Sequence, residues 1–260
     1  MTTSNASTTD ASAATELPLF YRSPAVLHSE AHADWRLEDG DVAFAADTAY
    51  VPIVVGEIAD ASHSYPVVFA GDAQLPVAIL GLSEGENLFV DQATWDRDHY
   101  VPAYVRRYPF GFVSIPGSDR FALAVDTASG RFGRGDSPGR PLFENGGPSE
   151  LTREALKFCE AYQAEFEHTK AFVGALQENG LLVERRADAR LADGRHYALN
   201  GFRVVDAERF RTLDEAVVVE WHRKGWLSLV NLHLASLGRL SALMERKVTR
   251  AGLAEDAGTG

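Results

Sequence analysis

Short apolar runs alternate with Gly, Pro, Asp and Asn between residues 20 and 125. The runs are rich in Val, Ile and Phe and are too short for helices, so they predict β-strands. They cover residues 42–44, 50–58, 65–70, 75–80, 87–90, 110–115 and 121–125. Gly71-Asp72 and the SEGEN stretch at 83–87 are typical of tight turns. The first half is therefore predicted to be largely an antiparallel sheet with short connections.

The hydrophobic period changes after residues 127–150, where Gly and Pro are dense and a long loop or hinge is predicted. Beyond it, apolar residues recur every three to four positions, which predicts a long amphipathic helix. Ser149 is suited to cap its start, and Asn179-Gly180 is suited to end it. The stripe consists of Leu151, Ala155, Phe158, Tyr162, Phe166, Thr169, Phe172 and Leu176.

The remaining chain predicts one hairpin and three helices. Asp193-Gly194 lies between two apolar runs and indicates a hairpin turn. Asp206 is expected to start a short helix, and Asp214 to cap a second one that stops at Gly225. A last helix begins at Trp226 and should turn inward the residues Leu227, Val230, Leu234, Leu237 and Leu240 or Leu243.

These patterns predict an α+β fold, with a strand-rich antiparallel N-terminal half packed with a helix-rich C-terminal half. We expect one domain over 17–260, made of a strand-rich part (17–126), the Gly/Pro loop (127–150) and a helix-rich part (151–250). Residues 1–16 are rich in Ser, Thr and Ala and are expected to form a disordered leader.

Charge and composition narrow the function classes. The chain has 25 basic and 37 acidic residues, a net charge of −12, which disfavours a nucleic-acid partner. The single cysteine, Cys159, excludes an intramolecular disulfide and fits a reducing compartment. We find neither a secretory signal pattern nor an apolar run of the roughly 20 residues that span a membrane, so a cytoplasmic protein is expected.

Motifs for metal and nucleophile chemistry are weak. The eight histidines show no HxH or HExxH spacing, and Glu165 with His168 forms only one Glu-x-x-His. A carboxylate-bridged di-iron centre needs a second copy, so a solvated helix face is the better interpretation. No GxSxG or Ser-x-x-Lys motif occurs. The glycines at 130–135 resemble a phosphate loop in spacing alone, because loop rather than helix follows them. No metal and no cofactor are predicted.

One stretch, YVPAYVRRYPF at 100–110, combines aromatic and arginine side chains in an otherwise acidic chain. On a strand, Tyr104, Arg106 and Tyr108 would share one face and Arg107 would lie on the other. In a helix, Tyr100, Tyr104 and Arg107 or Tyr108 would stack instead. In both cases one arginine could lie against a tyrosine ring and offer its planar fork to a carboxylate or phosphate.

The candidate ligand site therefore comprises Tyr104, Arg106, Arg107 and Tyr108, with Trp95 and Asp72 as neighbours. The structural alternative pairs one of the arginines internally with Asp72 or Asp91, to hold loops together.

Seven stretches, spread over most of the chain after Leu17, resemble the bacterial SapC-like family. They are residues 65–72, 76–82, 85–91, 100–110, 141–147, 201–210 and 229–240. The resemblance implies no general activity. It implies an association with a surface-layer locus and with neighbours that are outer-membrane receptors and flavin-dependent halogenase-like proteins. Arg131, Arg134 and Arg140 make residues 127–140 basic, where the resemblance leads us to expect an acidic loop.

Three function classes remain open. The first is a binding or accessory protein for a peptide, a small anionic ligand or a protein partner, linked through the resemblance to nutrient uptake or peptide modification. The second is an enzyme with a spatially assembled site, using groups such as Asp72, Asp91 and His99. The third is a structural protein associated with the surface layer. The absence of any linear catalytic or metal motif favours the binding protein.

Overall fold

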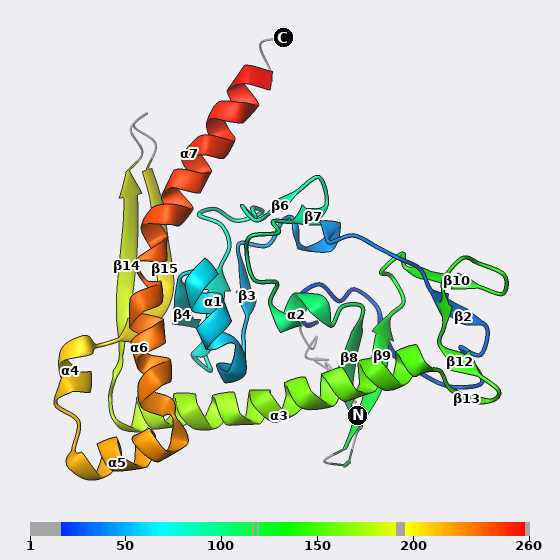
Figure 1. The fold of residues 1–260 in the computed structure, drawn as a ribbon, viewed down its shortest axis with the longest axis horizontal. Helices are drawn as coiled ribbons and strands as arrows, with labels where there is room; N and C mark the ends of the chain where they lie inside the picture. The colour runs from blue at the N-terminus through cyan, green and yellow to red at the C-terminus, as the bar shows by residue number, and fades with distance from the viewer. Residues whose placement is uncertain (1–16, 116, 119, 191–195, 258–260) are drawn as a thin grey trace, which may run out of the picture.

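The largest sheet joins the two halves of the chain (Figure 1). The computed structural model describes residues 17–115, 117–118, 120–190 and 196–257. The sheet has five antiparallel strands in the order β14-β15-β4-β5-β3. Its strands are β3 (Tyr50–Pro52), β4 (Val67–Ala70), β5 (Leu75–Ile79), β14 (Leu182–Arg190) and β15 (His196–Val205). The predicted α+β fold is confirmed, although two of these strands belong to the half predicted as helix-rich.

The other strands form small sheets. One three-stranded sheet contains β1 (Pro24–Val26), β9 (Phe121–Asp126) and β8 (Phe110–Ser114), and another contains β10 (Phe132–Arg134), β2 (Trp35–Leu37) and β11 (Arg140–Pro141). Two strand pairs complete the set: β6 (Val90–Asp91) with β7 (Thr94–Trp95), and β12 (Phe143–Glu144) with β13 (Gly147–Pro148).

Helices follow the predicted boundaries closely in the second half. They are α3 (Glu150–Glu178), α4 (Ala207–Arg211), α5 (Glu215–Lys224), α6 (Trp226–Ser236) and α7 (Arg239–Ala257). The first half has the short helices η1 (Ala43–Ala45), η2 (Val55–Glu57), α1 (Ile58–Ser64) and α2 (Ala103–Arg106). Ser149 accepts a hydrogen bond from the Thr152 N–H, and Asp206 accepts bonds from the first turn of α4, as predicted. Asp214 stands at the N-cap position of α5, but its side chain forms no capping hydrogen bond, so that predicted cap is wrong.

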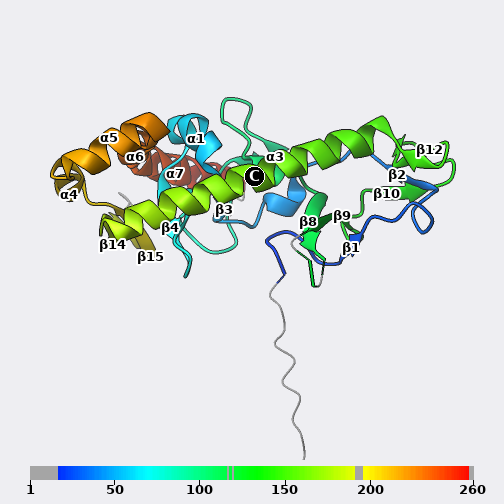
Figure 2. The same ribbon diagram turned by 90° about the horizontal axis from the view of Figure 1, so that it is seen from below.

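The long helix α3 runs along the body of the molecule and contributes to two hydrophobic cores (Figure 2). Its C-terminal part packs Tyr162, Phe172 and Leu176 into the main core, which surrounds the five-stranded sheet. Its N-terminal part packs Leu151 and Cys159 into a minor core under β8 and β9. One amphipathic stripe therefore holds together the two groups of sheets.

A side chain of α6 completes the large sheet. Strands β15 and β4 pair at Phe202↔Ala70 and Arg203↔Phe69, a register that two residues further along would place Val205 opposite Val67. There the ladder is replaced by His233, whose Nε2 accepts from the Val205 N–H at 3.0 Å. Its Nδ1 must then carry the proton, and it donates to the Val67 carbonyl at 2.9 Å. Ser236 accepts from the Val67 N–H at 3.0 Å, so both polar groups of Val67 and the Val205 N–H are paired.

Several predicted elements differ in the structure. Residues 42–44 form η1 rather than a strand, because Asp41 accepts a hydrogen bond from the Ala43 N–H and turns the backbone. The run 50–58 is a strand only to Pro52, because the Glu57 carboxylate accepts from the Val54 N–H and starts η2 and α1. Residues 87–90 contribute only the first residue of β6.

Three further expectations need correction. The predicted loop 127–150 contains the four short strands β10 to β13. The last helix is broken near Gly238 into α6 and α7. Phe166 is only half-buried, beside Lys170, whereas Phe172 is 0% exposed. The expected leader 1–16 and the Asp193-Gly194 turn lie outside the described residues.

Within the described residues, one helical stretch, from Trp226 to Ala251, is long and apolar enough to cross a membrane by length and composition, with a mean hydropathy of 1.2. A core helix passes the same test, and Val230, His233 and Leu243 of this stretch are buried in the protein. The expected absence of a membrane span stays a prediction.

The buried imidazole of His233 predicts a specific loss of stability in acid. Burial lowers its pKa from 6.5 to about 4, against the opposing effect of the Val67 hydrogen bond. The unfolded chain therefore takes up a proton below pH 6.5 while the folded protein does not. The free energy of unfolding should fall by up to about 3 kcal/mol between pH 6.5 and pH 4 through this group.

Urea denaturation across this pH range, with His233→Gln as the matched variant, measures the effect. The variant should be less stable at pH 7 and should show a flatter pH dependence. If the variant does not fold, an NMR titration of the wild type replaces it. A His233 resonance that titrates near pH 6.5 in the folded protein would contradict the prediction.

The two phenylalanines of α3 should differ in their contribution to stability. Phe172→Ala should lower the free energy of unfolding by about 3–5 kcal/mol, because it opens a cavity in the main core. Phe166→Ala should lower it clearly less, because that ring is already half in solvent. Chemical denaturation of both variants measures the difference, and equal losses would mean that this face of α3 is placed wrongly.

Candidate functional site

Residues 100–110 form one helical turn and the start of a strand. Pro102 precedes α2, and the Ala103 N–H at the start of the turn donates to the buried Glu57 carboxylate at 2.5 Å. The chain leaves the helix at Arg107, passes a cis peptide bond between Tyr108 and Pro109, and enters β8. The strand arrangement considered for this stretch is therefore wrong, and the helical alternative is the one observed.

Arg107 lies inside a cage of tyrosine rings. Its Cζ is 4.0 Å from the Tyr104 ring centroid, 4.5 Å from that of Tyr162 on α3 and 5.7 Å from that of Tyr21. Burial raises the pKa of all three phenols, so they stay protonated at neutral pH and supply no negative charge. In the described part of the chain Arg107 forms no ion pair, and its Nε has no hydrogen-bond partner. Cation–π contacts and a side-chain hydrogen bond with Tyr104 hold this buried charge.

Arg106 is exposed and has different partners. Its Nε donates to the Val101 carbonyl at 3.0 Å, and a terminal nitrogen donates to the Tyr100 hydroxyl at 2.9 Å. That hydroxyl in turn donates to Glu57 at 2.9 Å. Burial raises the pKa of Glu57, against the lowering effect of hydrogen bonds from Ala103, Val54 and Tyr100. The two adjacent arginines therefore have different partners.

Both arginines line a cavity of about 280 Å³ between α2, α3 and the start of β8. Two further arginines, Arg131 and Arg140, reach it from the segment predicted as a basic loop. Glu154 is the one carboxylate among the lining residues. The remaining walls comprise Tyr108, the thiol of Cys159, and the apolar side chains of Leu37, Pro109, Phe110, Leu151, Ala155 and Phe158.

The four arginines are not equally free. Arg140 pairs with Glu154 at 3.7 Å, and both side chains are largely exposed. Arg131 is half-buried, and its terminal nitrogens donate to the carbonyls of Tyr108 (3.3 Å) and Glu38 (3.4 Å). Burial lowers the pKa of Arg131, and Asp39, Tyr108 and Asp41 partly offset this. The guanidinium remains charged at neutral pH because arginine starts from a very high pKa.

A hydrogen bond and a ring contact hold the side chain of Tyr108 in place. Its hydroxyl donates to the buried Asp126 carboxylate at 2.8 Å, which also accepts from the Ser23 N–H at 2.7 Å. Its ring packs on Phe44 at 4.2 Å between centroids. Because Arg131 bonds to the Tyr108 carbonyl, this anchoring also positions the second half-buried cation of the cavity.

The cavity contains half of the predicted site. Arg106, Arg107 and Tyr108 line it, and Tyr104 lies behind Arg107 as a stacking partner. Asp72 is exposed in the β4–β5 turn and does not line it, and neither does Trp95. Neither arginine pairs with Asp72 or Asp91. Sequence reasoning missed Tyr21, Tyr162 and Phe158 as partners, although the stripe of α3 included the last two.

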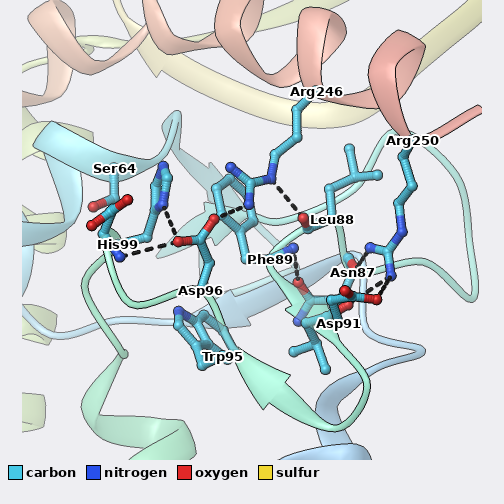
Figure 3. A network of polar contacts seen from close by, with 12 residues as sticks. Ser64, Asn87, Leu88, Phe89, Asp91, Trp95, Asp96, His99, Arg246 and Arg250 are labelled. Carbon is cyan, nitrogen blue, oxygen red and sulfur yellow. Dashed lines mark hydrogen bonds and ion pairs between the residues drawn. The ribbon is translucent and has the colours of Figure 1, made fainter. Parts of the chain in front are cut away.

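Trp95, Asp91 and His99 belong to a second polar cluster (Figure 3). Asp96 lies at its centre, 3.3 Å from His99 Nδ1 and in an ion pair with Arg246 of α7. Arg246 also donates to the Leu88 carbonyl at 2.6 Å and lies over the Phe89 ring. Burial would raise the pKa of Asp96, but hydrogen bonds from Arg246, the Asp98 N–H and His99 lower it to about 2. Asp91 is 3.9 Å from Arg250, and Trp95 is buried and donates to the Tyr65 hydroxyl at 3.1 Å.

This cluster connects α7 to the loop around β6 and β7. Arg250 donates to the carbonyls of Asn87 and Val90, both at 2.7 Å, and Lys247 pairs with Glu86. Every basic group in it is used by a carbonyl or a carboxylate of the protein. These contacts attach α7 to the loop around β6 and β7.

Within the described residues no group of three or more His, Cys, Asp or Glu side chains is arranged to hold a metal ion. Glu165 and His168 lie on the solvent side of α3, 3.3 Å apart, and Glu165 accepts from the Gly56 N–H at 3.1 Å. Burial raises the pKa of the Cys159 thiol to about 11, against the lowering effect of Arg107. The thiol is therefore protonated at neutral pH.

A family model described as SapC matches residues 27–243, which is most of the chain. The chain belongs to the SapC family. The resemblance found in the sequence is thus confirmed, and every residue that lines the arginine cavity falls within the part matched to SapC. No match was found among curated proteins or among solved structures. The geometry of this SapC chain must therefore supply the argument for its function.

The polar contacts between α7 and the loop around β6 and β7 predict how α7 detaches. Arg246→Ala removes the ion pair to Asp96 and the bond to the Leu88 carbonyl, so residues 88–96 and α7 should lose protection together. Hydrogen exchange with mass spectrometry measures this loss. Arg239→Ala, on an exposed position of the same helix, is the matched control and should leave exchange unchanged. Unchanged protection in Arg246→Ala would show that apolar packing alone holds α7.

Proposed function

We propose that this protein is a binding or accessory protein that holds a small anionic ligand, or the acidic group of a peptide, in the arginine-lined cavity. The observation that carries the proposal is the charge of that cavity. Four arginines and one glutamate line it, in a chain whose net charge is −12. A concave site lined mainly by one sign of charge concentrates ligands of the opposite sign.

The tyrosine cage of Arg107 adds to this argument. It holds a buried charge among rings that are uncharged at neutral pH, with no ion pair to Arg107 among the described residues. A bound carboxylate or phosphate would supply the missing negative charge through bidentate hydrogen bonds. The rigid cage also holds the guanidinium in one orientation before the ligand arrives, which lowers the entropic cost of binding.

The setting that SapC membership suggests belongs to the same proposal. We infer that the binding serves nutrient uptake at the outer membrane or peptide modification, and that it takes place in the cytoplasm. The lone buried Cys159 supports a reducing compartment. The second polar cluster does not favour the enzyme alternative, because its basic groups are used within the protein.

Isothermal titration calorimetry with four simple anions tests the proposal. The probes are inorganic phosphate, acetate, octanoate and N-acetyl-triglycine with a free carboxyl terminus. At least one should bind, and Arg131→Gln should weaken that binding about tenfold or more, because it removes a charge-assisted donor. Arg106→Gln should weaken it by less, because that side chain is exposed and already has partners. Arg211→Gln, on the exposed surface of α4, is the matched control and should bind like the wild type.

Thermal melts of the same variants separate binding from folding. Arg106→Gln should keep the wild-type Tm, because that side chain is exposed. Arg107→Lys should lower the Tm as well as the affinity, because lysine cannot fill the space between two tyrosine rings with a planar cation. Absence of binding by all four probes, or binding that ignores both arginine substitutions, would reject the proposed function.

A further inference from the structure

The cavity has two chemically different walls, and this difference defines its ligand more narrowly. We propose that it takes an amphipathic organic acid, with the acidic head group between Arg107 and Arg131 and an apolar body against Phe110, Leu151 and Ala155. The inference rests on the proposed function and adds to it the class of ligand. It follows from how the lining residues differ in burial and in partners.

Arg107 and Arg131 form the inner pair. Both are more buried than the other two arginines, and neither forms an ion pair in the described part of the chain. Arg131 is held by the carbonyls of Tyr108 and Glu38, which are neutral and leave its charge uncompensated. Asp39 and Asp41 attract the Arg131 charge electrostatically, and neither forms an ion pair with it among the described residues. The two guanidinium groups are held in fixed positions beside one cavity, so together they are suited to bind a single acidic head group.

Arg106 and Arg140 form the outer pair. Both are exposed, and both are already engaged, Arg106 by Val101 and Tyr100 and Arg140 by Glu154. Exposed charges with partners contribute little to affinity but speed the approach of an anion. We therefore assign recruitment to the outer pair and retention to the inner pair.

The apolar wall explains why an acid alone is an incomplete ligand. Phe110 and Leu151 belong to the minor core, and Ala155 packs against that core, yet all three border the cavity. An apolar body placed there would have the side that faces these three residues removed from water. The volume of about 280 Å³ equals that of about nine water molecules, so the body is short. An acid of roughly eight carbons fits this limit, and a bilayer lipid exceeds it.

A chain-length series on the wild-type protein tests the inference by calorimetry. Acetate, butyrate, hexanoate, octanoate and decanoate share one head group and differ only in the body. Affinity should rise by about fourfold for each added methylene and should level off near octanoate. Octanol, which lacks the charge, should bind at least tenfold more weakly than octanoate. Octyl phosphate should bind as octanoate does, since the two forks accept either head group.

Two variants locate the apolar body. Ala155→Phe fills the cavity from α3 and should abolish the gain from chain length while leaving acetate binding within about twofold. Leu156→Phe is the matched control, because Leu156 is the neighbouring residue, is 37% exposed and does not line the cavity. It should behave like the wild type in every titration. The series on the wild type decides the question if Ala155→Phe does not fold.

The possible failures are distinguishable. If acetate and octanoate bind equally and both depend on Arg131, the proposed function stands and the amphipathic ligand is wrong. If vesicles of phosphatidylglycerol bind the protein and octanoate does not compete, the ligand is a membrane lipid and the inference is overturned. If octanol equals octanoate, charge has no role and both proposals fall.

Discussion

A single positive charge lies where the two hydrophobic cores of this protein meet. The guanidinium of Arg107 is stacked between Tyr104 and Tyr162 of the main core, while the next strand residue, Phe110, and Cys159 on α3 belong to the minor core. The stack joins α2 to α3 and fixes the point at which the chain crosses from one core to the other. Because the side chains of both cores exclude water, the Arg107 charge interacts with other charged groups more strongly than it would in water. The position of the cavity follows from this constraint.

The sequence predicted correctly those helices whose ends are set by capping residues within the helix or next to it. Ser149 and Gly180 delimit α3, and Asp206 and Gly225 mark α4 and the end of α5, because a cap acts within a few residues of itself. The break of β3 at Pro52 could not be found this way. It depends on Glu57, whose carboxylate is directed at Val54 by a tertiary environment that includes Ala103 and Tyr100.

The candidate site was likewise predictable from local sequence only in part. The composition of residues 100–110 singled out Arg106 and Arg107, and the basic character of residues 127–140 singled out Arg131 and Arg140. No local pattern could join these two segments, since the cavity exists only after α3 has packed across both. Trp95 and Asp72 were grouped with the arginines by residue type, as an aromatic ring and a carboxylate, yet Trp95 is buried beside Tyr65 and Asp72 lies in an exposed turn. A linear motif thus identified the cations and not the walls around them.

The side chains of α6 that close the large sheet also bear on how the chain reaches this fold. His233 and Ser236 bond to Val67 across sequence separations of 166 and 169 residues. Contacts this remote carry a large loop-closure entropy and tend to form late in folding. During synthesis, β4 and β5 emerge well before β15 and α6. The edge of β4 that later pairs with β15 and α6 is therefore unpaired for that time. A chaperone or a second copy of the chain would meet that open strand edge first, until β15, His233 and Ser236 cover it.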